Sequence, residues 1–392
     1  MNILKGLIFG QCLGDAVGLI TEFQRKGETK KIEFPYKYNI RDWPICDWTD
    51  DSDQMLLLLE LIIQHEVTAK KFAEKLLYWK NKGFPELGDI QGRGIGGTTM
   101  SVVNDPCFLE NPKQVAKNFW IGSGKTIAAN GALMRTSILS ICDNYLDVSK
   151  EICQVTHADP RCIASCLVLN EAISLIMKDQ IKDLKKNAVL TGIKYFRTLN
   201  NRDRIVPIVK NKGIPHNWIN KKYIYLIDRN SNIYYYDYER ELLDYSNFNC
   251  HANITEQSQT INHILDNPHN LNKILSYSLS NLELDKQGIG YTYKCLGCAM
   301  WTMDIIEYDF LQKQHKSSKQ HNQQATLNFK NFIKAIVLEA GDADTNAACV
   351  GALLGTYIGY KSLYEQAEDW INAMPNTQWL HDKIDNGIKM RL

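Results

Sequence analysis

The sequence lacks the features that define several specialised protein classes. Its apolar runs stop short of the roughly 20 residues that a membrane-spanning helix needs, and no small-residue cleavage site follows the apolar stretch near the N-terminus. The formal net charge is only +1, so no whole-chain field attracts nucleic acid or an anionic membrane. The segment ending in Lys125 resembles part of a P-loop, but Phe119 stands where that motif requires glycine. These absences favour a cytoplasmic or nuclear protein.

Cysteine is present, but without the pattern of a disulfide or zinc framework. The 11 cysteines are an odd number in a long chain and lie mostly in apolar runs, which favours free thiols in a reducing compartment. Cys295 and Cys298 form a single C-x-x-C with no second pair and no nearby histidine. We therefore expect buried helix cysteines at these two positions rather than a zinc site.

Helical periodicity dominates the 392 residues, of which 44% are hydrophobic. A helix face begins at Met55, and similar patterns occupy residues 114–120, 132–141, 163–177 and 327–338. Strand signals are few; residues 223–227 and 233–236 predict a β-hairpin. We expect an all-α protein with one domain over residues 1–392. Residues 201–286, rich in Asn, Tyr and Lys, are predicted to be an irregular insertion that contains the hairpin.

Two segments repeat small residues every fourth position. Glycine occurs at positions 6, 10, 14 and 18, and the second row consists of Ala343, Ala347, Gly351, Gly355 and Gly359. Glycine inside a helix costs about 1 kcal/mol relative to alanine, so such rows need a compensating contact. A stripe of small residues lets another backbone approach closely. We expect two central helices, and if they pack together, the two ends of the chain share one site.

The first acidic cluster lies directly before the helix that begins near Met55. Ordinary N-capping explains one aspartate or threonine at such a position. Here four aspartates and a threonine fall within seven residues, which exceeds what capping needs. Crowded carboxylates repel one another unless a cation or protons neutralise them. The cluster comprises Asp47, Thr49, Asp50, Asp51 and Asp53.

A second cluster, Asp342, Asp344 and Thr345, opens the C-terminal row of small residues. All the candidate ligands are hard oxygen atoms, which favours Mg²⁺ or Mn²⁺ over zinc. Neither cluster has the glycine and glutamate spacing of an EF-hand loop. Two Asp/Thr clusters at two helix starts together predict a binuclear metal site.

Three further segments have both a structural and a functional interpretation. Glu22 follows the first glycine row and lies either in solvent or close to the metals. Residues 130–135 (NGALMR) form either an ordinary loop-to-helix junction or a backbone that holds an anion. His157, in a predicted turn, is either a satisfied turn residue or a ligand contact.

These segments, in this order, resemble those of the ADP-ribosylglycohydrolase family. The matching stretches are GDAVG with the following TEF, then WTDDSD, GIGGTTMSVV, NGALMRTSIL, THADPR and AGDADTNAACVGALLG. They extend from about residue 4 to residue 359 and leave out residues 201–286. The resemblance implies a domain of packed, roughly orthogonal helices around two divalent cations, Mg²⁺ or Mn²⁺.

The resemblance also implies roles for individual residues. Thr49, Asp50, Asp51 and Asp344 would hold one ion, and Asp342, Asp344 and Thr345 the other. Glu22 or Asp51 is the candidate general base. The residues expected to bind the ADP-ribose moiety are Asp15, Gly96, Thr98, Asn130, Gly131, Met134, Arg135 and His157.

The implied activity is hydrolysis that removes ADP-ribose from a modified target at the distal ribose. Some members have an aspartate at the position of Gly94, and Asp89 is five residues away, so the linkage cleaved stays open. Two alternatives are a catalytically inactive ADP-ribose-binding module and a hydrolase of a free ADP-ribosyl or nucleotide conjugate; the retained metal carboxylates favour the enzyme. We expect a monomer whose partner is an ADP-ribosylated protein or another ADP-ribosyl conjugate, with nucleic acid only as a modified substrate and no membrane.

Overall fold

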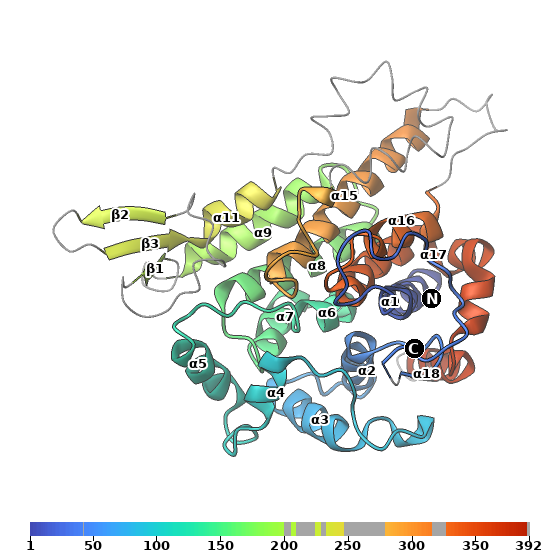
Figure 1. Cartoon of the computed structure of the whole chain (residues 1–392), viewed down its shortest axis with the longest axis horizontal. Coiled ribbons are helices and arrows are strands. Elements are labelled where there is room, and N and C mark those ends of the chain that lie inside the picture. Colours follow the sequence, from blue (N-terminus) through green and yellow to red (C-terminus); the bar gives the residue numbers. More distant parts are fainter. Residues whose placement is uncertain are drawn as a thin grey trace.

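The computed structural model describes residues 1–41, 43–199, 205–208, 224–228, 233–246, 279–315 and 327–389, most of them in helices (Figure 1). Before residue 200 the elements are α1 (Asn2–Gly18), α2 (Asp50–Ile63), α3 (Ala69–Lys82), η1 (Pro85–Leu87), α4 (Gly97–Val103), α5 (Pro112–Gly122), α6 (Leu133–Thr136), η2 (Ser137–Ile141), α7 (Tyr145–Cys153), α8 (Pro160–Met177) and α9 (Leu184–Thr198). After it come β1 (Ile205–Ile208), β2 (Ile224–Asp228), β3 (Ile233–Asp237), α11 (Tyr238–Ser246), α15 (Thr292–His315), α16 (Phe329–Val337), α17 (Ala343–Ala373) and α18 (Thr377–Lys389).

The helices predicted from apolar periodicity are present, with one difference. Residues 132–141 form not a single α-helix but the short α6 followed by the 3₁₀ turn η2. The Thr136 hydroxyl donates to the Leu133 carbonyl (3.3 Å), and the Ser140 hydroxyl donates to the Ser137 carbonyl (2.8 Å). Such local bonds compete with the α-helical ladder, which explains the tighter geometry.

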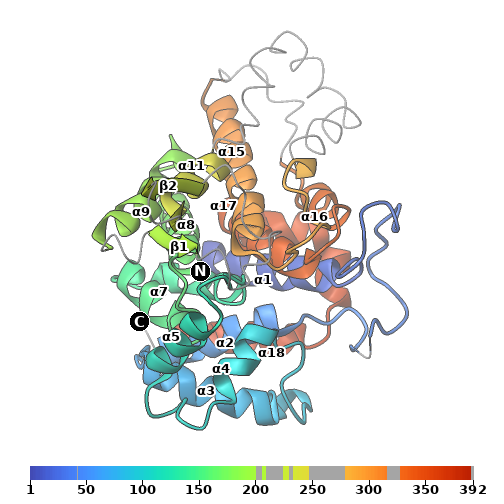
Figure 2. The ribbon, with the colours of Figure 1, turned by 60° about the vertical axis from the view of Figure 1, so that its left-hand side comes forward.

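The two rows of small residues pack against each other. A Cβ atom added at Gly6 would overlap the carbonyl of Gly355, and one added at Gly10 would overlap that of Gly351. As the position along α1 rises from Gly6 to Gly10, the contacted position on α17 falls from Gly355 to Gly351. The two helices are therefore antiparallel and in close backbone contact. Figures 1 and 2 show this pair at the centre, with α15 and α16 on one side and α2 on the other. Both helices are central, as predicted, with most of the residues of α1 and of the first half of α17 buried, and they do pack together.

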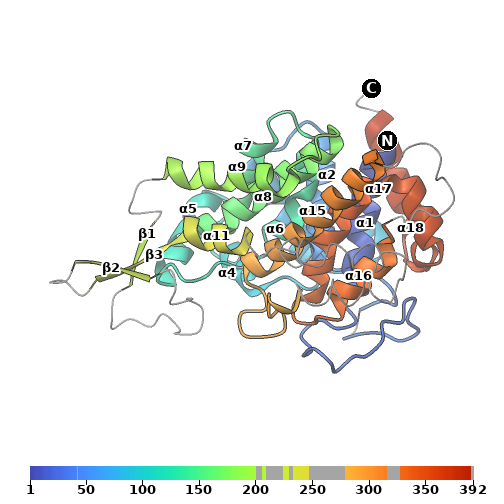
Figure 3. The same cartoon turned by 90° about the horizontal axis from the view of Figure 1, so that it is seen from above.

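The predicted hairpin is present as strands β2 and β3, which pair antiparallel. A third strand that the sequence did not predict, β1, pairs with the other side of β3, which gives the order β1-β3-β2. The sheet lies away from the central helices, beyond α11 (Figures 1 and 3). The remainder of the predicted insertion lies outside the described residues, apart from α11 and residues 279–286.

α8 is a core helix. By length and composition it is the one helix among the described residues that passes the test for a membrane span, but 89% of its apolar window is buried inside the protein. Cys295 and Cys298 are also fully buried, in α15, as expected.

Candidate active site and metal centre

The antiparallel pairing brings the end of α1 to the start of α17. After Gly18 the chain turns, and Phe23 N donates to the carbonyl of Gly341 (2.6 Å), while Gly341 N donates to the carbonyl of Gln24 (3.1 Å). Gly341 has φ +75°, and a Cβ there would overlap the carbonyl of Leu284, so glycine is required. Glu22 therefore lies beside the acidic residues that open α17, although some 320 positions separate them in the sequence.

Asp15, on α1, caps the neighbouring helix α2. Its carboxylate accepts hydrogen bonds from Thr49 N (3.0 Å) and Oγ1 (2.7 Å), and from Ser52 N (3.0 Å) and Oγ (2.7 Å). This carboxylate satisfies amides at the N-terminus of α2 that have no partner inside the helix. The aspartates in the first turn of α2 are therefore released from capping and are available for other contacts.

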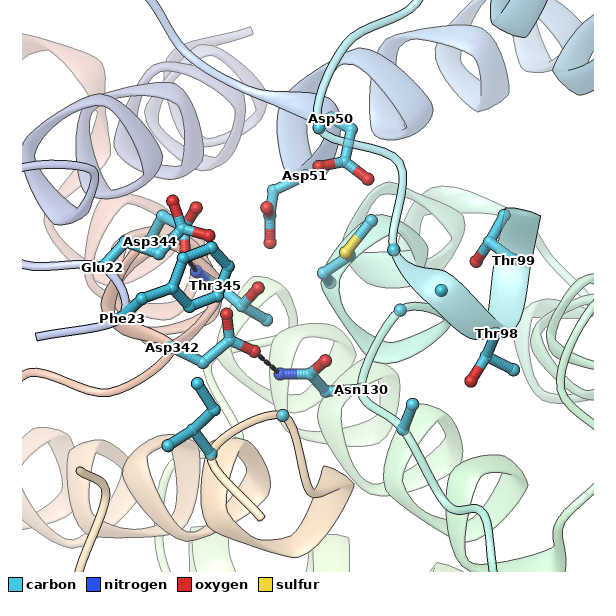
Figure 4. Close-up of a pocket in the computed structure, with 18 of the residues that line it drawn as sticks. Glu22, Phe23, Asp50, Asp51, Thr98, Thr99, Asn130, Asp342, Asp344 and Thr345 are labelled. Carbon is cyan, nitrogen blue, oxygen red and sulfur yellow. Dashed lines mark hydrogen bonds between the residues drawn. The ribbon is translucent and has the colours of Figure 1, made fainter. Parts of the chain in front are cut away.

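Asp50 and Asp51 lie in that first turn and line one end of a cavity of about 250 Å³. Asp50 Oδ2 accepts from the side-chain amide of Gln54 (2.9 Å). Asp51 Oδ1 is buried and has no hydrogen-bond partner among the described residues. Figure 4 shows the two carboxylates facing Asp344 and Asp342 across this space.

Burial and crowding make the charged forms of these acids unfavourable. Burial raises the pKa of Asp50, Asp51 and Asp344 well above the usual range, and repulsion from neighbouring carboxylates raises it further. Burial also raises the pKa of Glu22, against the opposing effect of Arg41, whose guanidinium forms an ion pair with it. The site therefore takes up either protons or cations.

The carboxylates form two groups that share one member. One oxygen each from Asp15, Asp51 and Asp344 lie within 4.8 Å of one another, and so do oxygens from Glu22, Asp342 and Asp344. The unpartnered Asp51 oxygen, the raised pKa values and the all-oxygen donor set fit divalent cations such as Mg²⁺ or Mn²⁺. The sequence-based ligand sets also placed Asp344 at both ions, but they did not include Asp15 or Glu22.

The opposite wall of the cavity is neutral. Asn130 bridges to the acidic end, because its side-chain amide donates to Asp342 Oδ2 (2.6 Å) and its backbone N donates to the carbonyl of Gly290 (3.0 Å). Next to it, a Cβ on Gly131 would lie 3.3 Å from both His157 Nε2 and Thr99 Oγ1. These groups offer hydrogen bonds without adding charge, as a site for a polar ligand requires.

Gly94 stands where some members of the family have an aspartate, and it supplies no carboxylate to the cavity. Gly94 has φ +77°, and a Cβ there would lie 2.7 Å from Asp50 Oδ1. Asp89 accepts from Phe84 N (3.1 Å) and from Arg93 (3.3 Å) and does not line the cavity. Asp89 is thus a loop-stabilising residue and does not replace the missing aspartate.

Most, but not all, of the predicted site residues line the cavity. The metal candidates Asp50, Asp51, Asp342, Asp344 and Thr345 do so, together with Glu22, Gly96, Thr98, Asn130, Gly131, Met134 and His157. Asp15, Thr49 and Arg135 lie behind its wall. Seven further lining residues were not assigned to the site from the sequence: Phe23, Gly94, Gly97, Thr99, Ala129, Ile289 and Gly290. The first four lie inside the motifs quoted above and Ala129 directly precedes one, whereas Ile289 and Gly290 follow the irregular region and carry no motif.

The fold and this acidic centre agree with the comparisons to known proteins. A sequence profile described as ADP-ribosylglycohydrolase matches residues 2–391. The chain belongs to the ADP-ribosylglycohydrolase family. A solved structure described as an ADP-ribosylglycohydrolase-related protein complex covers 100% of this chain and 98% of its own, with a TM-score of 0.55 and 17% identity. The all-α fold expected of the family is therefore confirmed.

Two curated proteins match part of this chain. The ADP-ribosylarginine hydrolase Tri1 of Serratia proteamaculans is 26% identical over 189 residues, which are 46% of this chain and 48% of that protein. An uncharacterised protein of Archaeoglobus fulgidus is 26% identical over 210 residues, 50% of this chain and 62% of that protein. The chain thus spans about half the length of the curated relatives it matches.

Proposed function

We propose that this protein is a metal-dependent glycosidase-type hydrolase that removes ADP-ribose from a modified target by cleaving the bond at the distal ribose. The observation that carries the proposal is the pair of carboxylate groups sharing Asp344 at one end of a cavity whose other end is neutral and polar. Membership of the family supports an ADP-ribosyl conjugate as the substrate class. The similarity to an ADP-ribosylarginine hydrolase supports an ADP-ribosylated protein.

The residues that would hold the two ions are Asp51, Asp342 and Asp344, with Asp344 common to both, and Glu22 lies beside the second. When bound, two Mg²⁺ or Mn²⁺ ions would supply positive charge able to polarise hydroxyl groups and water and to stabilise charge that develops as the glycosidic bond breaks. ADP-ribose is itself anionic, so carboxylates without cations would repel it. Metal removal should therefore weaken ADP-ribose binding as well as turnover.

The chain's own groups orient the sugar and move the proton. Asn130, held against Asp342, and the backbone around Gly131 present donors and acceptors to the ligand. Glu22 lies in the turn next to Phe23, whose side chain is 64% exposed and lines the cavity. From there its carboxylate can accept a proton from an attacking water. Asp51, deeper at the start of α2, is better placed to hold an ion.

Two variants separate these roles. Glu22→Gln keeps the shape of the side chain and a neutral oxygen but cannot act as a base, so kcat should fall by about 10²–10⁴-fold with Mn²⁺ affinity changed far less. Asp51→Asn should lose Mn²⁺ affinity together with activity. The assignment of the base to Glu22 is wrong if the two variants behave the other way round.

The central test is release of free ADP-ribose from arginine-linked, serine-linked and nucleic-acid-linked substrates, with Mg²⁺ and with EDTA. EDTA-sensitive release from one linkage would support the proposal and name the target. Binding of ADP-ribose without release from any of the conjugates, free ones included, would instead identify a binding module.

A further inference from the structure

Arg135 lies completely inside the protein, at the short helix α6 behind the cavity wall. Its side chain is 0% exposed and its guanidinium carbon lies 4.8 Å from the ring centroid of Phe72. A guanidinium has only hydrogen-bond donors. Each polar group that it contacts must therefore present an acceptor, and this requirement fixes where the protons of its neighbours point.

One branch of contacts leads from Arg135 to the metal carboxylates. Arg135 donates to Gln54 Oε1 (2.9 Å), so the amide nitrogen of Gln54 must face the other way. That nitrogen donates to Asp50 Oδ2 (2.9 Å). The carboxylate of Asp50 is consequently anchored through one oxygen, and its Oδ1 faces Gly94 at the cavity.

The second branch leads to the neutral wall. The other terminal nitrogen of Arg135 donates to Thr156 Oγ1 (2.7 Å), and the same oxygen lies 2.7 Å from His157 Nδ1. Among the described residues, Nδ1 is the only acceptor within hydrogen-bond distance of the Thr156 hydroxyl. If Nδ1 carried the proton, that buried hydroxyl proton would have no partner, which costs about 1–3 kcal/mol. With Thr156 donating to an unprotonated Nδ1, the donor left over is instead Nε2–H, which belongs to the cavity lining, where water or a ligand can accept from it. This arrangement is therefore the lower in energy.

A neutral imidazole with an unprotonated Nδ1 carries its proton on Nε2. Burial and the nearby Arg135 lower the pKa of His157 to about 3, so the ring is neutral at physiological pH. His157 Nε2 is buried, has no partner among the described residues and belongs to the cavity lining. It is thus a donor that faces the ligand space next to Gly131.

We propose that Arg135 is a positioning residue that sets the direction of hydrogen bonding on both sides of the site. Through Thr156 it holds His157 as the Nε2–H tautomer, a fixed donor to an oxygen acceptor of the ligand. Through Gln54 it orients the carboxylate of Asp50. The tautomer follows from the contacts of the ligand-free protein, whereas its use in recognition rests on the proposed function, with ADP-ribose as the ligand.

The first experiment reads the tautomer directly. Two-bond ¹H–¹⁵N correlation spectra of the ¹⁵N-labelled, ligand-free protein distinguish protonated from unprotonated imidazole nitrogens, and His157→Gln identifies the signals of His157. We expect an unprotonated, hydrogen-bonded Nδ1 and a protonated Nε2. A proton on Nδ1, or a charged ring, at neutral pH would overturn the proposal.

The second experiment uses a matched pair of variants at the relay. Thr156→Ser keeps the hydroxyl and should bind ADP-ribose, with Mg²⁺ present, as the unmodified protein does. Thr156→Val keeps the volume, removes the hydroxyl and leaves a donor of Arg135 unpaired; its affinity for ADP-ribose, measured by calorimetry, should fall about tenfold, as for loss of one positioned hydrogen bond. Equal affinity of folded Thr156→Val and Thr156→Ser proteins would refute the relay.

The two experiments also separate this proposal from the proposed function. If the unmodified protein shows the Nε2–H tautomer but does not bind ADP-ribose, the hydrogen-bond order stands and the ligand assignment fails. If it binds and hydrolyses an ADP-ribosyl conjugate but His157 carries its proton on Nδ1, the hydrolase stands and the role of Arg135 fails. Arg135→Lys, which offers one ammonium in place of a planar fork, should resemble Thr156→Val in ADP-ribose affinity.

Discussion

Replacing Gly10 by alanine tests the contact that assembles the site. A Cβ at this position would overlap the carbonyl oxygen of Gly351 and lie 3.0 Å from the Cα of Gly355. The three nearest atoms all belong to the backbone of α17, so no side-chain rotation can relieve the overlap and the two helices must separate. Overpacking of this kind costs about 1–3 kcal/mol, and here at the upper end of that range because the backbone itself must shift.

The gain from better helix propensity opposes this cost. Alanine is about 1 kcal/mol better than glycine inside a helix, so we expect a net loss of about 2 kcal/mol in the free energy of unfolding. The measurement is urea denaturation followed by far-ultraviolet circular dichroism. Gly122→Ala is the matched control, because Gly122 is also in a helix but has no atom within 4 Å of an added Cβ. If Gly10→Ala is as stable as that control, the close approach of α1 and α17 is wrong.

Three further predictions concern the acidic centre. Asp344→Asn should abolish both Mn²⁺ binding, measured by calorimetry, and hydrolysis, because Asp344 belongs to both carboxylate groups; full turnover by this variant would refute the shared ligand. In EDTA, the thermal midpoint should rise as pH falls from 8 to 6.5, because carboxylates such as Asp47, whose pKa burial raises to about 7, bind protons in the folded state that the unfolded state does not bind. Mg²⁺ should weaken this trend, since it replaces the protons on the carboxylates of the cavity but not on Asp47. Arg41→Gln should bind Mn²⁺ several-fold more tightly, because it removes a positive charge that lies near Glu22 and acts on Asp342, whereas Arg25→Gln, the same charge change in the same loop, should leave the affinity unaltered.

The sequence predicted the helices whose residues follow a regular spacing. Apolar residues at helical spacing located α2, α5, α8 and α16, and the rows of small residues identified α1 and α17 as central helices because glycine inside a helix needs a packing reason. The break between α6 and η2 was not predicted, because it depends on which way the hydroxyls of Thr136 and Ser140 turn. The strand β1 was not predicted either, since four residues containing a proline carry little strand pattern.

The site was predictable as a set of residue types but not as a set of contacts. The two Asp/Thr clusters indicated a metal centre because so many carboxylates exceed what capping needs. Asp15 was expected at the ligand, yet it caps α2 through four hydrogen bonds, a role that depends on the placement of α1 against α2. Arg135 was also expected at the ligand, but it is fully buried behind the wall. Linear sequence says which groups are near in the chain, not which side of a helix faces the cavity.

The pairing of α1 with α17 also has a consequence for how the protein is made. The small-residue stripe of α1 is synthesised some 340 residues before its partner stripe around Gly351 and Gly355. Contacts so distant in sequence slow folding, and an uncovered helix face is prone to misassociate while it waits. The acidic centre needs Asp342 and Asp344, so it cannot form before the start of α17 has been synthesised and has packed against α1.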